Sequence, residues 1–179
     1  MNEYYFVSAR ENNPDYYEEK RLWHTHLEAK KGKSYIIRLF AHNNNRFGTD
    51  ATAEDVRVRF HIGPAVHVTA DEVHDVEGFS SENGYWAVGV TGYISSSNAD
   101  PKEYRYTMKF VSNKPFHLEY IPGSALFENN GIGAGGIRLP DSIVTDEGVM
   151  IGFDALDGEI PGCYKYSSYS IIRVYPVFE

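Results

Sequence analysis

Two stretches in the first third of the chain alternate in side-chain character with the period of two that a β-strand imposes. Residues 34–42 carry bulky side chains in both alternating sets. We therefore expect a strand in the interior of its sheet, with Arg38 and His42 on the wetter face. Residues 56–62 place valine, phenylalanine and isoleucine in one set and arginine and histidine in the other, which predicts a strand with one buried face.

Residues 43–50 lie between these two stretches and are rich in Asn, Gly and Asp. Such residues tolerate left-handed backbone angles and cap their own turns through side-chain hydrogen bonds. The simplest interpretation is a loop that joins the two strands of a hairpin. We expect the second strand to end at Gly63–Pro64, because proline cannot donate a hydrogen bond to a neighbouring strand.

Further runs of strand character, separated by turn residues, continue along the chain. They cover residues 4–9, 22–27, 65–76, 85–95, 104–110, 116–121, 149–153 and 168–177. The run 65–76 carries charges that are typical of an edge strand, and no stretch shows a helical stripe of useful length. Many short strands at regular spacing predict an all-β fold, a sandwich of two mainly antiparallel sheets.

Composition agrees with a single β domain over residues 1–179. The chain has 14 tyrosines and 10 phenylalanines, which favour sheet, and its length suits one domain that removes roughly 70% of its unfolded surface from water. The formal charge of −8 opposes binding to nucleic acids and to anionic membrane surfaces. The first residues lack the pattern of a secretory signal and no run is apolar enough to span a bilayer, so we expect no membrane insertion by this segment.

Several segments carry a family resemblance. They are residues 32–45 with 53–58, the Tyr-x-Pro-Gly-Ser-Ala turn within 118–125, and residues 139–141 with 154–163. In these segments the chain resembles the immunoglobulin-like modules, of unknown function, found in secreted and cell-surface proteins of bacteria. The resemblance implies an immunoglobulin-like β-sandwich with elaborated loops and a location outside the cell or at its surface. It supplies no catalytic residues.

Aromatic side chains are the first candidate for a ligand site. Trp23, Tyr85 and Trp86, together with the tyrosines at 16–17, could form a stacking surface for sugar rings, since such side chains combine an apolar face with a polar edge. The alternative is that they belong to the core, where aromatic residues at alternate strand positions are usually found.

Acidic side chains near the C-terminus are a candidate calcium site. Asp154, Asp157 and Glu159 supply hard oxygen ligands, and earlier in the chain Asn43, Asn45 and Asp50 offer amide and carboxylate oxygens. The three acidic residues near the C-terminus are the stronger candidates. They lack the Asp-x-Asp-x-Asp-Gly spacing that wraps one ion, and the same residues make turns without a metal. The sequence therefore predicts turn chemistry first and a structural calcium second, with no other cofactor.

Two weaker candidates involve histidine and cysteine. His24 and His26 would share one face of a strand, a spacing that can chelate zinc, although the sequence identifies no third ligand. Cys163 is the single cysteine, which excludes an intrachain disulfide. A nucleophile is one interpretation of Cys163, and the favoured one is a small buried side chain beside a turn.

These patterns favour a non-catalytic, extracellular adhesion or structural module that presents loops to protein partners or spaces other domains. The alternative is a carbohydrate-binding module for glycans at the cell surface, and the third hypothesis is a hydrolase. An aromatic strip exposed on one sheet would favour the carbohydrate hypothesis, and titratable groups with strongly shifted pKa values in a deep pocket would favour the hydrolase.

Overall fold

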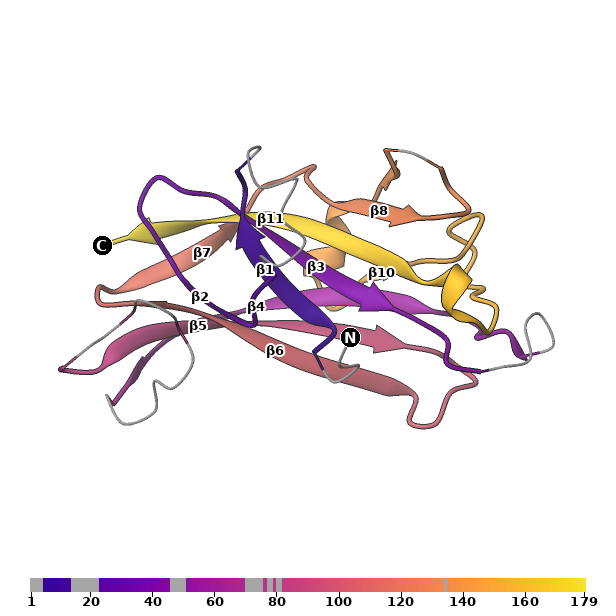
Figure 1. The fold of residues 1–179 in the computed structure, drawn as a ribbon, viewed down its shortest axis with the longest axis horizontal. Coiled ribbons are helices and arrows are strands. Elements are labelled where there is room, and N and C mark those ends of the chain that lie inside the picture. The colour runs from indigo at the N-terminus through magenta and orange to yellow at the C-terminus, as the bar shows by residue number, and fades with distance from the viewer. Residues whose placement is uncertain are drawn as a thin grey trace.

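The chain folds into two β-sheets that pack on each other, as the computed structural model shows (Figure 1). It describes residues 5–13, 23–45, 51–69, 76, 79, 82–133 and 135–179. The strands are β1 (Val7–Glu11), β2 (His26–Glu28), β3 (Tyr35–Ala41), β4 (Arg57–Val68), β5 (Tyr85–Ser95), β6 (Glu103–Ser112), β7 (Phe116–Tyr120), β8 (Leu126–Asn129), β9 (Ile137–Arg138), β10 (Val149–Met150) and β11 (Ser168–Phe178), with single 3₁₀ turns η4 (Asp141–Val144) and η5 (Tyr164–Tyr166).

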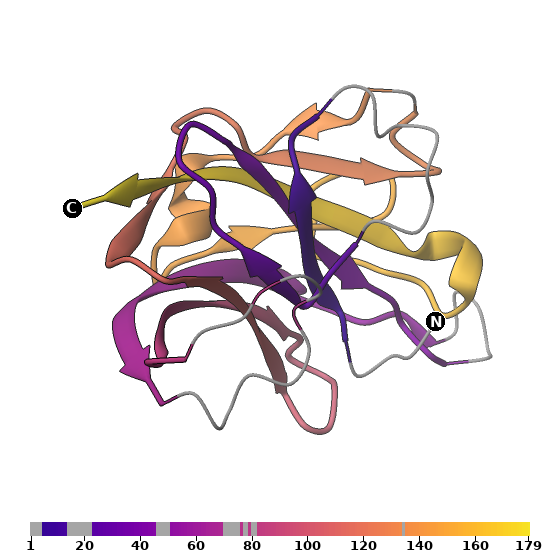
Figure 2. The ribbon, with the colours of Figure 1, turned by 60° about the vertical axis from the view of Figure 1, so that its left-hand side comes forward.

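The two sheets differ in how their strands are connected. The first runs in the order β1-β3-β11-β8-β9, and β7 also pairs with β11. The second runs in the order β10-β4-β5-β6-β2, in which β2 lies parallel to β6 and the other neighbours are antiparallel. Figure 2 shows the layers from the side, with β4, β5 and β6 below the yellow β11. The predicted all-β class is confirmed.

One core lies between the sheets, built by the period of two that the sequence shows. Ile37 and Leu39 of β3 are fully buried and face Val90 of β5 and Met108 of β6, which are also fully buried. Gly92 of β5 faces Val7 and Leu39 of the other sheet. A Cβ atom there would lie 2.5 Å from Val7 Cγ2 and 2.9 Å from Leu39 Cδ1, so only glycine fits. The alternating side chains thus determine the inner face of both sheets.

The predicted hairpin between residues 34–42 and 56–62 is wrong, although both strands exist. β3 lies between β1 and β11, and is an interior strand as expected. β4 pairs with β5 and β10 in the other sheet. The segment between them therefore crosses from one sheet to the other. Alternation predicts a strand and its buried face, but it carries no information about the partner strand.

The predicted end of the second strand at Gly63–Pro64 is also wrong. β4 continues to Val68, and its register with β5 shifts between Ile62 and Ala65. A β-bulge places extra residues opposite one residue of the partner, so the missing proline N–H breaks no ladder bond there. The predicted separate edge strand at 65–76 begins as the end of β4, and residues 70–75 lie outside the described part of the chain.

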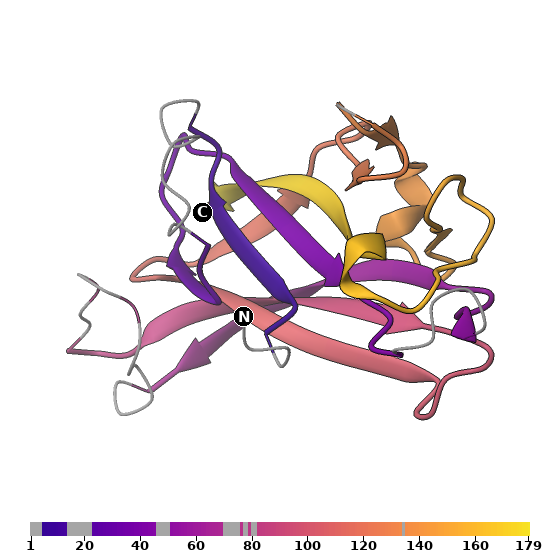
Figure 3. The same ribbon diagram turned by 45° about the vertical axis from the view of Figure 1, so that its right-hand side comes forward.

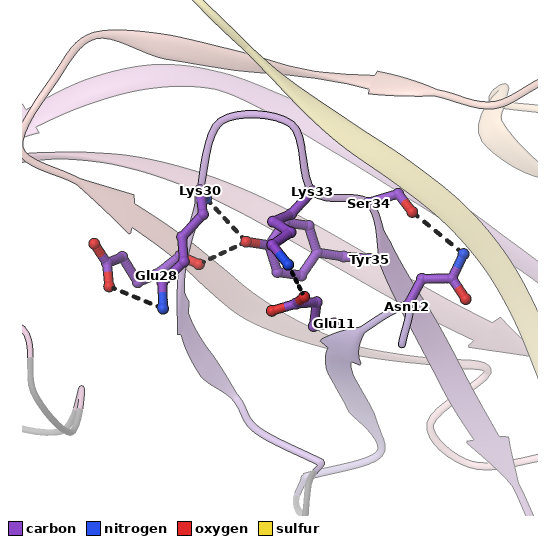
Figure 4. Close-up of polar contacts among 7 residues, drawn as sticks. All are labelled: Glu11, Asn12, Glu28, Lys30, Lys33, Ser34 and Tyr35. Atoms are coloured by element: carbon purple, nitrogen blue, oxygen red, sulfur yellow. Dashed lines mark hydrogen bonds and ion pairs between the residues drawn. The ribbon is translucent and has the colours of Figure 1, made fainter. Parts of the chain in front are cut away.

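Tyr35 fixes the connection between β2 and β3 (Figure 4). Its hydroxyl donates to the Glu28 carbonyl at 3.0 Å and accepts from the Lys30 N–H at 2.9 Å. Its ring is 1% exposed and meets Phe110 edge-on, with ring centroids 5.1 Å apart. At the surface above it, Lys33 forms an ion pair with Glu11 at 2.8 Å. One side chain therefore joins the β2–β3 turn to the core.

Candidate functional site

A pocket of about 570 Å³ opens at the end of the molecule where β3 and β5 end and β4 and β6 begin. We call it the loop-end pocket. Figure 3 shows on its right the loops after β3, between β5 and β6, and before β11 coming together at this end. The lining residues are Phe6, Phe40, His42, Asn43, Asn44, Asn45, Ala53, Val56, Ile94, Ser95, Ser96, Ala99, Pro101, Lys102, Tyr104, Arg105 and Ile160.

Asn43 holds one wall of the loop-end pocket. Its side-chain amide donates to the Ala51 carbonyl at 2.8 Å and to the Ile160 carbonyl at 3.0 Å. Its side-chain oxygen accepts from the Asn45 N–H at 3.1 Å, which closes a local turn. Asn43 therefore joins the end of β3 to Ala51, on the way to β4, and to Ile160, which lies 117 positions later in the chain.

Asn98 holds the opposite wall. Its amide donates to the Thr52 carbonyl at 2.9 Å, and its oxygen accepts from the Glu54 N–H at 2.9 Å. The Ser96 hydroxyl donates to the Glu54 carbonyl at 2.9 Å. Residues 51–54 are thus bonded on both sides, to the loop after β3 and to the β5–β6 loop. Such bonds reduce the conformational entropy that the loops would lose on binding, because they hold the walls in one arrangement before a ligand arrives.

The lining combines apolar surface with hydrogen-bonding groups. Phenylalanine, valine, isoleucine, alanine and proline supply apolar walls, while asparagine, serine and tyrosine supply amides and hydroxyls. Lys102 and Arg105 add positive charge, and the described lining contains no carboxylate. The size and the mixture of groups are those of a site for a small ligand.

The predicted aromatic ligand residues do not share one surface. Trp23 lies on the outer face of the first sheet, with the Arg38 guanidinium carbon 4.0 Å and that of Arg10 4.9 Å from its ring centroid. Burial lowers the pKa of the Arg38 guanidinium, which also lies 5.0 Å from the Tyr169 ring. Trp23 is therefore bound to arginines of its own chain. The tyrosines at 16–17 lie outside the described residues.

Tyr85 and Trp86 point to opposite faces of β5, as neighbours on a strand must. Tyr85 is 5% exposed and packs with Ala87 and Val111 in a small cluster on the outer face. Trp86 is partly buried against the main core and meets His67 edge-on, with ring centroids 5.2 Å apart. Neither residue lines the loop-end pocket.

The predicted calcium residues lie on an exposed turn. The Asp157 carboxylate accepts a hydrogen bond from the Glu159 N–H at 3.0 Å, and Asp154 and Glu159 are exposed. Within the described part of the chain, no group of three or more histidine, cysteine, aspartate or glutamate residues is arranged to hold a metal ion. The turn interpretation therefore describes what Asp157 does here.

His24 and Cys163 occupy the surface. His24 is exposed and bridges to Ala9 through the backbone, while His26 Nδ1 lies 3.3 Å from the Thr25 hydroxyl. Cys163 is a free, exposed cysteine, so the favoured expectation of a buried side chain is wrong. Its φ of 142° belongs to a sharp turn before η5, where the side chain is directed away from the core.

Sequence reasoning did not identify the loop-end pocket as a site. Its lining comes from five separate stretches of the chain, at residues 6, 40–45, 53–56, 94–105 and 160, so no local pattern in the sequence marks it. The run Asn43–Asn45 is the one available signal in the sequence, and it predicts turn chemistry or, with Asp50, oxygen ligands for calcium; Asp50 lies outside the described residues. No protein-family model, curated protein or solved structure matches this chain. In the described residues, no helix has the length and hydrophobicity needed to cross a membrane.

Proposed function

We propose that this chain is a non-catalytic, immunoglobulin-like recognition module that works outside the cell and binds a glycan in the loop-end pocket. The observation that carries the proposal is the pocket itself, about 570 Å³ in volume, with walls joined by the side chains of Asn43 and Asn98. Loops held on a rigid sheet scaffold are the usual place for recognition in folds of this type.

The chemistry of the lining supports a sugar as the ligand. Sugar rings have apolar faces and a rim of hydroxyls, so they bind where flat apolar groups meet amides and hydroxyls. Phe6, Phe40 and Tyr104 are the aromatic residues of the lining, and Asn45 and Ser95 are among its polar residues. Because the described lining has no carboxylate pair, it favours binding over glycoside hydrolysis, which uses two carboxylates flanking the bond.

The experiment is a glycan array followed by titration calorimetry with the purified chain. A blocking variant, Ala99→Trp, fills the loop-end pocket from the β5–β6 loop, because Ala99 lines the pocket. Asn113→Trp is the matched control, since Asn113 is exposed in the β6–β7 connection and does not line the pocket.

Saturable binding that Ala99→Trp abolishes and Asn113→Trp preserves is the expected result. Both variants are checked for native circular dichroism and unfolding midpoint. Absence of binding to every glycan contradicts the proposal and favours a module that faces protein partners. Binding that survives Ala99→Trp contradicts the assignment to this pocket.

A further inference from the structure

The lining of the loop-end pocket includes two cations, although the net charge of the chain is −8 and the exposed Glu54, Asp100 and Glu103 lie on the same loops. Lys102 and Arg105 both line the pocket. Among the described residues, neither takes part in an ion pair, whereas Lys30 and Lys33 at the other end of β3 both pair with glutamates. Two cations without a carboxylate partner at a concave site favour a ligand that brings the negative charge itself.

A row of three residues continues this charge onto the outer face of the second sheet. In the register of β4, β5 and β6, Arg59 lies opposite Tyr93, and Tyr93 lies opposite Arg105. The Arg59 guanidinium carbon is 3.5 Å from the centroid of the Tyr93 ring. We call these residues the cationic row. Tyr93 thus has the Arg59 guanidinium against its ring and Arg105 at the neighbouring position of β6, and Arg105 is also one of the residues that line the pocket.

The neighbouring positions on this face strengthen the positive field. Arg57 and Lys109 alternate with buried residues and are exposed on the same outer face. Two carboxylates border the row. Asp146, fully exposed, lies 4.0 Å from Arg59, and Glu103 precedes Arg105 by two positions. Around the cationic row, four cations therefore stand against two carboxylates, in a chain whose overall charge is negative.

We propose that the glycan bound by this chain is acidic, with one carboxylated sugar in the loop-end pocket and the adjoining units along the cationic row. This inference rests on the proposed function and adds the ligand class. Arginine forms paired hydrogen bonds to a carboxylate, and the cationic row places two arginines on neighbouring strands next to the pocket. The overall negative charge opposes unspecific binding of polyanions, so binding depends on this local arrangement.

The test compares acidic oligosaccharides with uncharged twins by titration calorimetry. Trigalacturonate is paired with its methyl ester, and sialyllactose with lactose. The charge variants are Lys102→Gln and Arg105→Gln. The matched control is Lys31→Gln, which removes the same charge from the exposed β2–β3 turn at the opposite end of β3.

The expected result is that the chain binds the acidic oligosaccharide of at least one pair and binds its uncharged counterpart more weakly or not at all. Each charge variant lowers the affinity for the acidic sugar roughly tenfold, the effect of losing one charged hydrogen bond, and Lys31→Gln leaves it unchanged. Raising the salt concentration weakens binding of the acidic member alone.

Other outcomes distinguish the preference for acidic glycans from the proposed glycan binding itself. Equal affinity for acidic and uncharged twins overturns the inference and leaves glycan binding in place. No binding to either member of any pair overturns both. Acidic binding that Lys102→Gln and Arg105→Gln leave intact, or that Lys31→Gln weakens equally, overturns the assignment of the charge to this site.

Discussion

Single side chains in this molecule join segments that lie far apart in the sequence. Tyr35 bonds two backbone groups of the β2–β3 connection while its ring packs in the core. Asn129 joins the end of β8 to a distant segment in the same way, because its amide donates to the Gly152 and Phe153 carbonyls at 3.2 and 2.7 Å. Buried or half-buried groups of this kind matter because each bond lost leaves a backbone partner unpaired.

Replacing Tyr35 by phenylalanine measures, at neutral pH, how much the hydrogen bonds of the Tyr35 hydroxyl stabilise the fold. Tyr35→Phe removes the hydroxyl and leaves the Glu28 carbonyl and the Lys30 N–H without that partner. We expect the free energy of unfolding to fall by about 1–3 kcal/mol, measured by urea denaturation. Tyr164→Phe is the control, because Tyr164 is 62% exposed. A Tyr35→Phe loss no larger than that of the control would contradict the role given to the hydroxyl.

The same residue predicts a pH dependence in alkaline solution. Burial raises the pKa of Tyr35 to about 12, above a value of roughly 10 in the unfolded chain. Between these two values the unfolded state releases the phenolic proton and the folded state keeps it. The titration of Tyr35 therefore leaves the stability of the fold unchanged below pH ~10, and it lowers that stability by up to about 3 kcal/mol as pH rises toward 12.

Urea denaturation of both proteins between pH 9 and 11.5 checks this. Tyr35→Phe lacks the titrating group, so the stability gap between it and the unmodified chain should narrow as pH rises. Contributions of the other tyrosines cancel in the comparison. A gap that is constant across the range would refute the raised pKa.

The strands of this fold depend on contacts between sheets as much as on their own alternation. Gly92 shows this, because the inner face of β5 lacks a side chain where Val7 of β1 and Leu39 of β3 approach. The sequence pattern correctly predicts β5 from Tyr85 to Ser95. The same alternation places Gly92 on the face of Val88 and Val90, but it does not indicate that Val7 and Leu39 leave no room for a side chain there.

Gly92→Ala should destabilise the chain by about 1–3 kcal/mol, the usual cost of overpacking a core. The added Cβ atom would lie 2.5 Å from Val7 Cγ2. In a Val7→Ala background this collision is reduced, so Gly92→Ala should cost less there. A double-mutant cycle by chemical denaturation measures the difference. Strict additivity of the two substitutions would show that the contact between the sheets is not the cause.

The strands were largely predictable from sequence, and their assembly was not. Period-two patterns depend on residues close together in the chain, so β3, β5 and β11 were predicted within a residue or two of their ends. Partner choice depends on contacts between distant segments, such as the bond from Asn43 to Ile160. The loop-end pocket consists of such contacts, and the bulge that accommodates Pro64 depends on its position opposite β5.

At the scale of the whole molecule, both sheets share a single core. Ile172 of β11, which is fully buried, belongs to the same cluster as Phe60 of β4 and Val90 of β5. A domain with one shared core is expected to unfold as a unit, because neither sheet can keep its inner face covered without the other.

Ile172→Ala tests whether the two sheets unfold together. We expect a loss of about 2–5 kcal/mol from the cavity left behind, and coincident loss of far-ultraviolet circular dichroism and tryptophan fluorescence in denaturant. Ile171→Ala is the matched control, since Ile171 lies on the outer face of the same strand and is only partly buried. Two separated transitions would indicate that the sheets unfold independently.

The position of β11 has a consequence for synthesis on the ribosome. β11 follows all the other strands along the chain, yet it pairs with β3 on one side and with both β7 and β8 on the other. The β4–β5–β6 meander can form from neighbouring segments as soon as they emerge, whereas the larger sheet must wait until residue 178 is released. During that interval β3 exposes an unpaired edge, so the nascent chain is most prone to aggregation just before its final strand arrives.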